Sequence, residues 1–250
     1  AAASGRTRPT GRGAARLPAP PRRAQMRLDA RVANLASPAA WGAAALAGRG
    51  PGSHSDLAAQ IVASAAGRGE PGSARRQREA AQQFMRVLGE PDREAVPDES
   101  AVGRVLGWAY PERIARRRPE QAKTARDVAF LCADGGEARL PQYDALAGQE
   151  WLAIANWDPQ PPRRIRSAAA LKFSEVERDH AAQIETVNEV HWDAETQTVV
   201  AEEQRRLGGI VLAVKPLRAG AQEKICAAIL DGIRDLGLDA LPWTETARQW

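Results

Sequence analysis

The residues of this sequence that best suggest a binding partner form two arginine clusters with tryptophans nearby. They are Arg116, Arg117, Arg118, Arg163, Arg164, Arg166, Trp151 and Trp157. Arginine holds phosphates and aromatic rings stack on bases, so this mixture is typical of a groove that binds single-stranded nucleic acid. The simpler interpretation is that the tryptophans fill the core of a β-barrel and the arginines are solvated.

The sequence contains no recognisable catalytic centre. None of its four lysines follows a glycine, so the Gly-Lys-Ser/Thr step of a phosphate-binding P-loop is absent. His54, His180 and His191 have no second histidine or cysteine at a metal-ligand spacing, so we predict no metal site. Cys132 and Cys226 lie in apolar patterns, and we expect both to be small buried side chains.

Helices are expected in the first half of the chain. The first 52 residues are rich in Arg, Pro and Gly, which predicts a loop. Apolar spacing then predicts a helix that begins within 54–57 and ends at a loop over 67–72, with Ser55 or Asp56 as its N-cap. Two further helices are predicted at about 75–88 and 99–108. These helices are expected to pack as a small bundle.

Beyond Arg126 the pattern changes to short β-prone runs. Strands are predicted at 128–132, 151–157, 163–167, 187–192, 198–201 and within 207–217. The last run is apolar on both faces, so it is expected to be a central strand. Ser174 to Glu177 forms a capping-box pattern, which predicts a helix to about Ile184. This arrangement suits a small antiparallel barrel or sandwich.

The chain returns to helix over 221–236. Four apolar residues repeat along it and are expected to form its buried stripe: Ile225, Ile229, Ile233 and Leu236. The fold class that follows is α+β, with helices first, a β-rich region next and a helix at the end.

Composition and charge narrow the classes of protein. The 250 residues contain no apolar run of about 18, so no membrane helix is expected, and the N-terminal sequence is not a secretory signal. Two cysteines favour a reducing, cytoplasmic setting. Residues 1–125 carry 21 basic and 11 acidic side chains, a net of +10, whereas residues 126–250 carry 14 and 20, a net of −6. The basic half could therefore face phosphates.

Several strings in order resemble one family. The run 110–118 is Tyr-Pro-Glu-Arg-Ile-Ala-Arg-Arg-Arg, the run 136–141 is Gly-Glu-Ala-Arg-Leu-Pro, and the run 205–212 is Arg-Arg-Leu-Gly-Gly-Ile-Val-Leu. Near the end come Leu-Asp-Gly-Ile-Arg at 230–234 and Gly-Leu-Asp-Ala-Leu-Pro-Trp at 237–243. Together they resemble segments of HrpB, a family of bacterial ATP-dependent helicases of the DEAH-box class.

The resemblance implies that this chain is the C-terminal portion of such a helicase, without the RecA-like motor domains that use ATP and Mg²⁺. It implies the end of a winged-helix domain at 1–30 and a ratchet-like helical bundle at 31–125. An OB-like β-rich domain would follow at 126–217, and the start of a C-terminal helical extension at 218–250. Single-stranded RNA or DNA and the motor domains would be its partners, with no ATPase activity in this chain.

Two alternatives stay open at this point. The acidic balance of residues 126–250 favours a non-enzymatic module that docks a protein. The second alternative is an inactive gene fragment.

Overall fold

A computed structural model describes residues 35–47, 55–68, 71–88, 98–119, 126–217, 220–238, 241 and 243–244, apart from the side chains of residues 71, 87 and 88. The winged-helix end expected at 1–30 lies outside the described residues. The chain divides into two compact units. The first runs to Ala181 and includes Gly208–Ile210, and the second comprises Ala182–Leu207 and Val211–Trp250.

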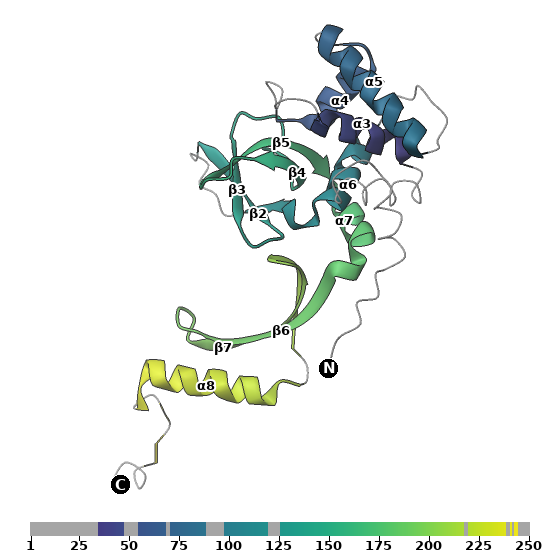
Figure 1. Ribbon diagram of the computed structural model, residues 1–250. Coiled ribbons are helices and arrows are strands. Elements are labelled where there is room, and N and C mark those ends of the chain that lie inside the picture. The colour runs from purple at the N-terminus through teal and green to yellow at the C-terminus, as the bar shows by residue number, and fades with distance from the viewer. Residues whose placement is uncertain are drawn as a thin grey trace, which may run out of the picture. The chain divides into compact units, whose positions relative to one another are not determined.

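Among the described residues, four helices precede the strands of the first unit (Figure 1). They are α3 (Ala36–Ala47), α4 (Leu57–Ala65), α5 (Pro71–Leu88) and α6 (Glu99–Ala109). Asp56 is the N-cap of α4, and its carboxylate accepts a hydrogen bond from the Ala59 amide at 3.0 Å, which confirms one of the two predicted caps.

Helix α3 corrects the prediction of a loop over the first 52 residues. Its sequence is mostly alanine, which has the highest helix propensity, and Pro38 lies in the first turn, where no intrahelical amide bond is lost. The buried residues Ala39 and Ala43 pack with Val105 and Ala109 of α6. The Pro- and Gly-rich sequence before α3 obscured this short apolar helix.

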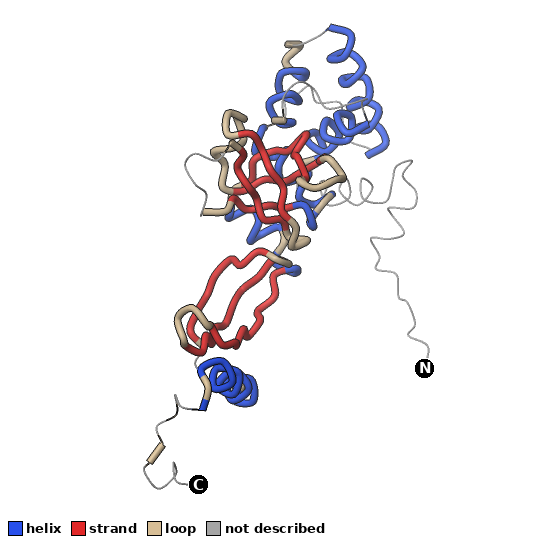
Figure 2. The backbone as a smooth tube through the Cα atoms, turned by 90° about the vertical axis from the view of Figure 1, so that its left-hand side faces the viewer, coloured by secondary structure: helices blue, strands red, loops and turns tan. Residues whose placement is uncertain are grey.

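The first unit continues into a closed barrel of five strands (Figure 2). The strands are β1 (Ile114–Arg117), β2 (Asp127–Cys132), β3 (Glu137–Pro141), β4 (Trp151–Trp157) and β5 (Arg163–Leu171). Their order around the barrel is β1-β2-β3-β5-β4 with β4 paired to β1, and the β3–β5 pair alone is parallel. This OB-like barrel, preceded by a helical bundle, confirms the predicted α+β architecture.

Alternation along the strands fills the barrel and sets its outer face. Val128, Phe130 and Cys132 of β2 lie in the core with Ala138 and Leu140 of β3. Side chains between these positions point outward because successive residues of a strand face opposite sides. A short 3-10 helix, η1 (Pro111–Arg113), leads directly into β1. The barrel therefore begins inside the range 31–125 that the sequence assigned to helices.

Helix α7 (Phe173–Asp179) follows the barrel and is shorter than predicted. It begins after Lys172, whose amide donates to the Glu175 carboxylate at 3.0 Å, rather than at Ser174. The ion pair between Arg104 of α6 and Asp179 holds the end of α7, with Nε to Oδ2 at 2.7 Å.

Where the structure describes it, the second unit forms a three-stranded sheet and one long helix. After the 3-10 helix η2 (Ala181–Gln183), strands β6 (Ile184–Asp193), β7 (Thr198–Leu207) and β8 (Ile210–Pro216) form a sheet in the order β6-β7-β8. The prediction of a central strand within 207–217 is wrong, because β8 is at an edge of this sheet. Its apolar side chains are mostly half-buried or exposed.

Helix α8 (Gln222–Leu236) confirms the predicted helix but not its buried stripe. Ala228 and Gly232 are its buried residues, whereas Ile229 and Leu236 are exposed. The small residues allow α8 to approach the sheet, where the Trp192 indole Nε1 donates to Asp235 at 3.0 Å. Cys226 is exposed, contrary to prediction, whereas Cys132 is buried as expected.

Candidate nucleic-acid interface

Trp151 has no ring face open to a nucleobase. It is 1% exposed, its ring stacks on Phe173 with centroids 5.6 Å apart, and the Arg116 guanidinium lies over it at 5.4 Å from the ring centroid. Arg116 also pairs with Glu150 at 3.2 Å. Trp151 is therefore a packing residue, but it packs outside the barrel-core cluster in which the simpler interpretation placed it.

Trp157 and Arg163 belong to a second cluster, closed by the protein's own cations. The guanidinium carbons of Arg113 and Arg163 lie 4.8 and 4.9 Å from the Trp157 ring centroid. Arg113 donates to the Ala155 carbonyl at 3.0 Å, and Arg163 pairs with Asp134 at 2.7 Å. A base could stack on Trp157 only by displacing an arginine.

Strand register brings three other arginines into one row on the outside of the barrel. The Arg118 amide donates to the Ala129 carbonyl, Ala129 is paired with Arg139, and Arg139 is paired with Arg164. The row therefore crosses from the end of β1 over β2 and β3 to β5, about 14 Å at the usual strand spacing. We call Arg118, Arg139 and Arg164 the arginine row.

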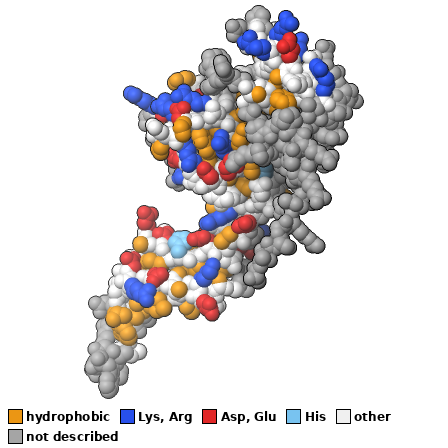
Figure 3. All heavy atoms as spheres, in the orientation of Figure 1, with side chains coloured by type: hydrophobic (Ala, Val, Ile, Leu, Met, Phe, Trp, Pro, Cys, Tyr) orange, Lys and Arg blue, Asp and Glu red, His pale blue; other side chains and the backbone are white. Residues whose placement is uncertain are grey.

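Carboxylates hold the arginine row in place. Glu137 pairs with both Arg118, at 3.3 Å, and Arg139, at 2.7 Å, and Asp127 lies 3.9 Å from Arg164. Figure 3 shows basic and acidic side chains interspersed on the face of the barrel that it presents. All three arginines remain exposed, so the row positions its cations while leaving them accessible to a solvated anion.

The remaining predicted arginines lie beside the row or apart from it. Arg166 follows Arg164 on β5 and makes two hydrogen bonds to Asp158, each 2.8 Å long, which lower the pKa of that carboxyl group. Arg117 is exposed at the end of β1. The structure thus brings together Arg118, Arg164 and Arg166, and separates them from the Arg116–Trp151 and Arg163–Trp157 contacts.

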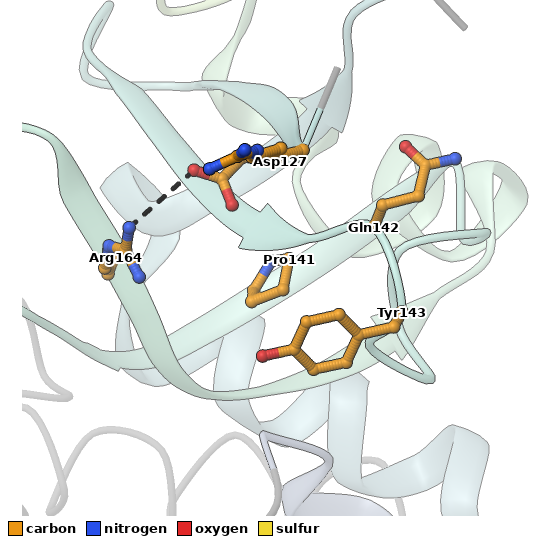
Figure 4. Close-up of a pocket in the computed structure, with 6 residues that line it drawn as sticks. Asp127, Pro141, Gln142, Tyr143 and Arg164 are labelled. Atoms are coloured by element: carbon orange, nitrogen blue, oxygen red, sulfur yellow. Dashed lines mark ion pairs between the residues drawn. The ribbon is translucent and has the colours of Figure 1, made fainter. Parts of the chain in front are cut away.

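A pocket of about 460 Å³ opens where β2 begins and β3 ends (Figure 4). Its lining residues are Arg126, Asp127, Pro141, Gln142, Tyr143 and Arg164. The Tyr143 ring lies beside Pro141, and its hydroxyl points towards the side of the pocket that holds Arg164. The pocket therefore joins an aromatic ring to one end of the arginine row.

The sequence did not single out Arg126, Arg139, Gln142 or Tyr143. Arg139 stands in the short strand β3, which propensity did not predict, and its place in the row depends on pairing with two other strands. Tyr143 follows the same strand. A signal was present, since Arg139 and Tyr143 are close in sequence and alternate with the apolar residues of β3.

No metal-binding cluster accompanies the interface in the part of the chain that the structure describes. No group of three or more His, Cys, Asp and Glu side chains there could hold a metal ion. Burial, with the nearby Asp134 carboxylate second, raises the pKa of Cys132 to about 12, which makes it a poor nucleophile. None of the described helices is long and apolar enough to cross a membrane.

Comparisons with known proteins point to one family. Residues 183–217 match the family model for the connector region of the ATP-dependent RNA helicase HrpB. ATP-dependent RNA helicase HrpB of Escherichia coli (strain K12) is 31% identical over 155 residues, which are 61% of this chain and 18% of that protein. This chain therefore spans less than a fifth of that relative.

Two solved structures extend the similarity to nearly the whole chain. One is the crystal structure of E. coli DExH-box NTPase HrpB, with a TM-score of 0.68 and 29% identity. The other is the crystal structure of Escherichia coli DEAH/RHA helicase HrpB, with a TM-score of 0.69 and 27% identity. Each match covers 97% of this chain and 28% of the other. By family model, sequence and fold, this chain is similar to the C-terminal region of HrpB helicases.

Proposed function

We propose that this chain handles single-stranded RNA or DNA for an HrpB-like ATP-dependent helicase, through the outer face of its barrel. The observation that carries the proposal is the arginine row, in which three exposed guanidinium groups cross one face. Arginine recognises phosphate with a planar set of donors, so such a row suits a nucleic-acid backbone. Backbone contacts of this kind give affinity without sequence specificity.

The interface consists of the arginine row with Arg126 and Arg166 beside it. Arg117 precedes Arg118 and is paired with the core residue Phe130, so it faces the other side of β1 and is not part of the row. Arg116, Arg163 and Trp157 take part only if a bound strand displaces their present contacts, and Trp151 supports the barrel from outside its core. The surface of β2 and β3 is also where OB-folds bind oligonucleotides.

The chain has no ATPase activity of its own in this proposal. Its sequence lacks a P-loop lysine step, so ATP and Mg²⁺ belong to RecA-like motor domains of a longer parent chain, located in the cytoplasm. The helices at 31–125 would act as the ratchet-like bundle, 1–30 would complete a winged-helix domain, and 218–250 would begin a C-terminal extension.

The test is binding of labelled single-stranded RNA and DNA oligonucleotides to the full 250-residue chain at about 50 and 200 mM salt. Replacing Arg118, Arg139 and Arg164 together with Ala should weaken binding strongly. The plot of log affinity against log salt should also become less steep. Its negative slope should shrink in magnitude by about 2, since each phosphate contact to a single strand contributes about 0.7.

The matched control removes three exposed cations from the second unit. Replacing Lys215, Lys224 and Arg234 with Ala lowers the net charge by the same amount. Affinity and slope should stay close to those of the unmodified chain. Equal losses in both triple variants would mean that total charge, rather than the arginine row, determines binding and would overturn the proposed interface.

A second candidate function, protein docking, is favoured by the second unit. Residues 182–250 carry 7 basic and 11 acidic side chains, a net of −4, which disfavours contact with phosphates. Among the described residues of this unit, six large apolar side chains are exposed: Val214, Ile229, Leu230, Leu236, Leu238 and Trp243. If the motor domains bind to this unit when the two parts are mixed, that result would support protein docking in addition to the barrel's role.

A further inference from the structure

Tyr143 is exposed without a structural reason. Its side chain is 91% exposed, so it contributes little apolar burial to the fold. The turn that carries it is nevertheless held by other groups. The Gln142 amide donates to the Arg126 carbonyl at 2.9 Å, and the Asp144 carboxylate accepts hydrogen bonds from Ser55 Oγ at 2.6 Å and the Leu146 amide at 2.9 Å.

The fixed turn presents the ring at the edge of an open surface pocket. The pocket of about 460 Å³ falls in the range of about 300–1,000 Å³ typical of small-ligand sites. Arg126 and Arg164 also line it, and Asp127 holds the Arg164 guanidinium at 3.9 Å (Figure 4). A planar aromatic group and two cations thus border one cavity.

We propose that this pocket binds one unpaired nucleobase, stacked on Tyr143, with the phosphates next to it held by Arg126 and Arg164. The inference rests on the proposed function and names the point on the barrel where a strand is gripped by a base as well as by its backbone. Stacking is tolerant of sequence because every base has a π-face. Bases inside a duplex are stacked on each other, so the site is selective for single strands.

The experiment compares Tyr143→Ala with Tyr143→Phe in the full chain, using a labelled single-stranded oligonucleotide at fixed salt. Tyr143→Ala should weaken binding by about 5- to 150-fold, the range found when base-stacking aromatics are replaced with alanine. Tyr143→Phe keeps the ring and should bind as the unmodified chain does. The salt slope should not change in either variant because no charge is removed. The high exposure of Tyr143 means that both variants should fold.

An oligonucleotide of the same length with abasic sites supplies the control for stacking. It should bind the unmodified chain as weakly as the normal strand binds Tyr143→Ala, and that substitution should not weaken its binding further. If Tyr143→Ala binds the normal strand unchanged while the triple arginine variant loses binding, the base pocket is wrong and the proposed function stands. If the unmodified chain binds no oligonucleotide at low salt, both are overturned.

Discussion

The barrel of the first unit and the sheet of the second both present strands to solvent, but they keep their apolar residues in different places. Every barrel strand has a neighbour on both sides, and the interior holds a continuous cluster that includes Phe130, Leu140 and Leu152 at 0% exposure. Among the described residues of the second unit, β6 and β8 are the outer strands of the three-stranded sheet, and α8 covers the sheet with Ala228 and Gly232 while Ile229 and Leu230 are exposed.

This difference teaches where each unit can interact. In a closed barrel the backbone hydrogen bonds of every strand are made and the apolar side chains are buried inside. The outer side chains are therefore available for polar contacts on a rigid frame. The second unit leaves apolar surface exposed, which is the kind of surface that protein contacts cover. We expect the packing contacts of the barrel to be rigid and those of the second unit to give way more easily, and each expectation can be tested separately.

The largest expected contrast is between the two cysteines. Cys132 is buried in the barrel core, with its pKa raised to about 12, whereas Cys226 is exposed on α8. Only the thiolate reacts with a disulfide reagent, and at pH 8 a pKa of 12 leaves about one part in ten thousand of Cys132 ionised. One thiol should therefore react in the folded chain and two in denaturant, as counted by absorbance. Two fast thiols in the folded chain would show that the barrel core opens readily.

The next effect concerns the contact between α6 and β5. An ideal Cβ on Gly103 would overlap the Ala170 carbonyl oxygen, which is backbone and cannot swing away. Gly103→Ala should therefore lower the free energy of unfolding of the first unit by about 2–3 kcal/mol, even though alanine favours helix. Urea unfolding followed by circular dichroism measures this change.

Gly148→Ala is the matched control for that substitution. A Cβ at Gly148 would have no atom within 4 Å, so this substitution should change stability by less than about 0.5 kcal/mol. A Gly103→Ala variant as stable as Gly148→Ala would mean that α6 can move off β5 at little cost. The barrel would then be less rigid than its packing indicates.

How far the sequence predicted this molecule depends on how local each feature is. Strands β2 and β4 were predicted because their apolar runs end at Asp-Gly-Gly and Asp-Pro turn signals, and the structure confirms both. The arginine row was not predicted, since Arg118, Arg139 and Arg164 come together only through the pairing of strands distant in sequence. No local pattern contains that register.

The side of α8 that is buried was missed for a related reason. Helical spacing makes Ile225, Ile229, Ile233 and Leu236 the natural core stripe, but the bulky Trp192 ring on the sheet fits against a small side chain. The sequence of a helix does not identify the surface that packs against it. The same lack of tertiary information misplaced Cys226.

A smaller effect is expected at the carboxylate that joins α6 to α7. Burial alone would raise the pKa of Asp179, but hydrogen bonds from Arg178 and Arg104 outweigh it and lower the pKa below its ordinary value. The resulting stabilisation is present above the unfolded-state pKa, near 3.8, and is lost as the pH falls through the lower folded-state value. Asp179→Asn should cost about 1–2 kcal/mol at pH 7.

The pH dependence separates charge from shape in that variant. The difference in unfolding free energy between Asp179→Asn and the unmodified chain should be constant from pH 7 to about 5 and shrink below about 3.8, as urea titrations at each pH would measure. A difference that persists unchanged well below pH 3 would mean that the amide disturbs packing. Arg104→Gln should show the same pH trend, because it removes the partner on α6.

The smallest expected effect is in the second unit, at Gly232 of α8. An ideal Cβ there would lie 2.6 Å from Cε3 of Trp192, a side chain that is only half-buried and can move. Overpacking therefore competes with the gain of about 1 kcal/mol when alanine replaces glycine within a helix. Gly232→Ala should speed amide hydrogen exchange in α8 by less than about tenfold.

A second substitution removes the ring and reverses the sign. With Trp192→Leu already present, adding Gly232→Ala should slow exchange in α8, since only the helix-propensity gain remains. If Gly232→Ala slows exchange while Trp192 is intact, the ring yields without cost and the second unit is softer than its contacts suggest. Another outcome is that Gly232→Ala speeds exchange by a factor that corresponds to the same free energy as Gly103→Ala costs the first unit. In that case the contact of α8 with the sheet is as rigid as that of α6 with β5. The contrast between the two units would then lie only in where their apolar residues are exposed.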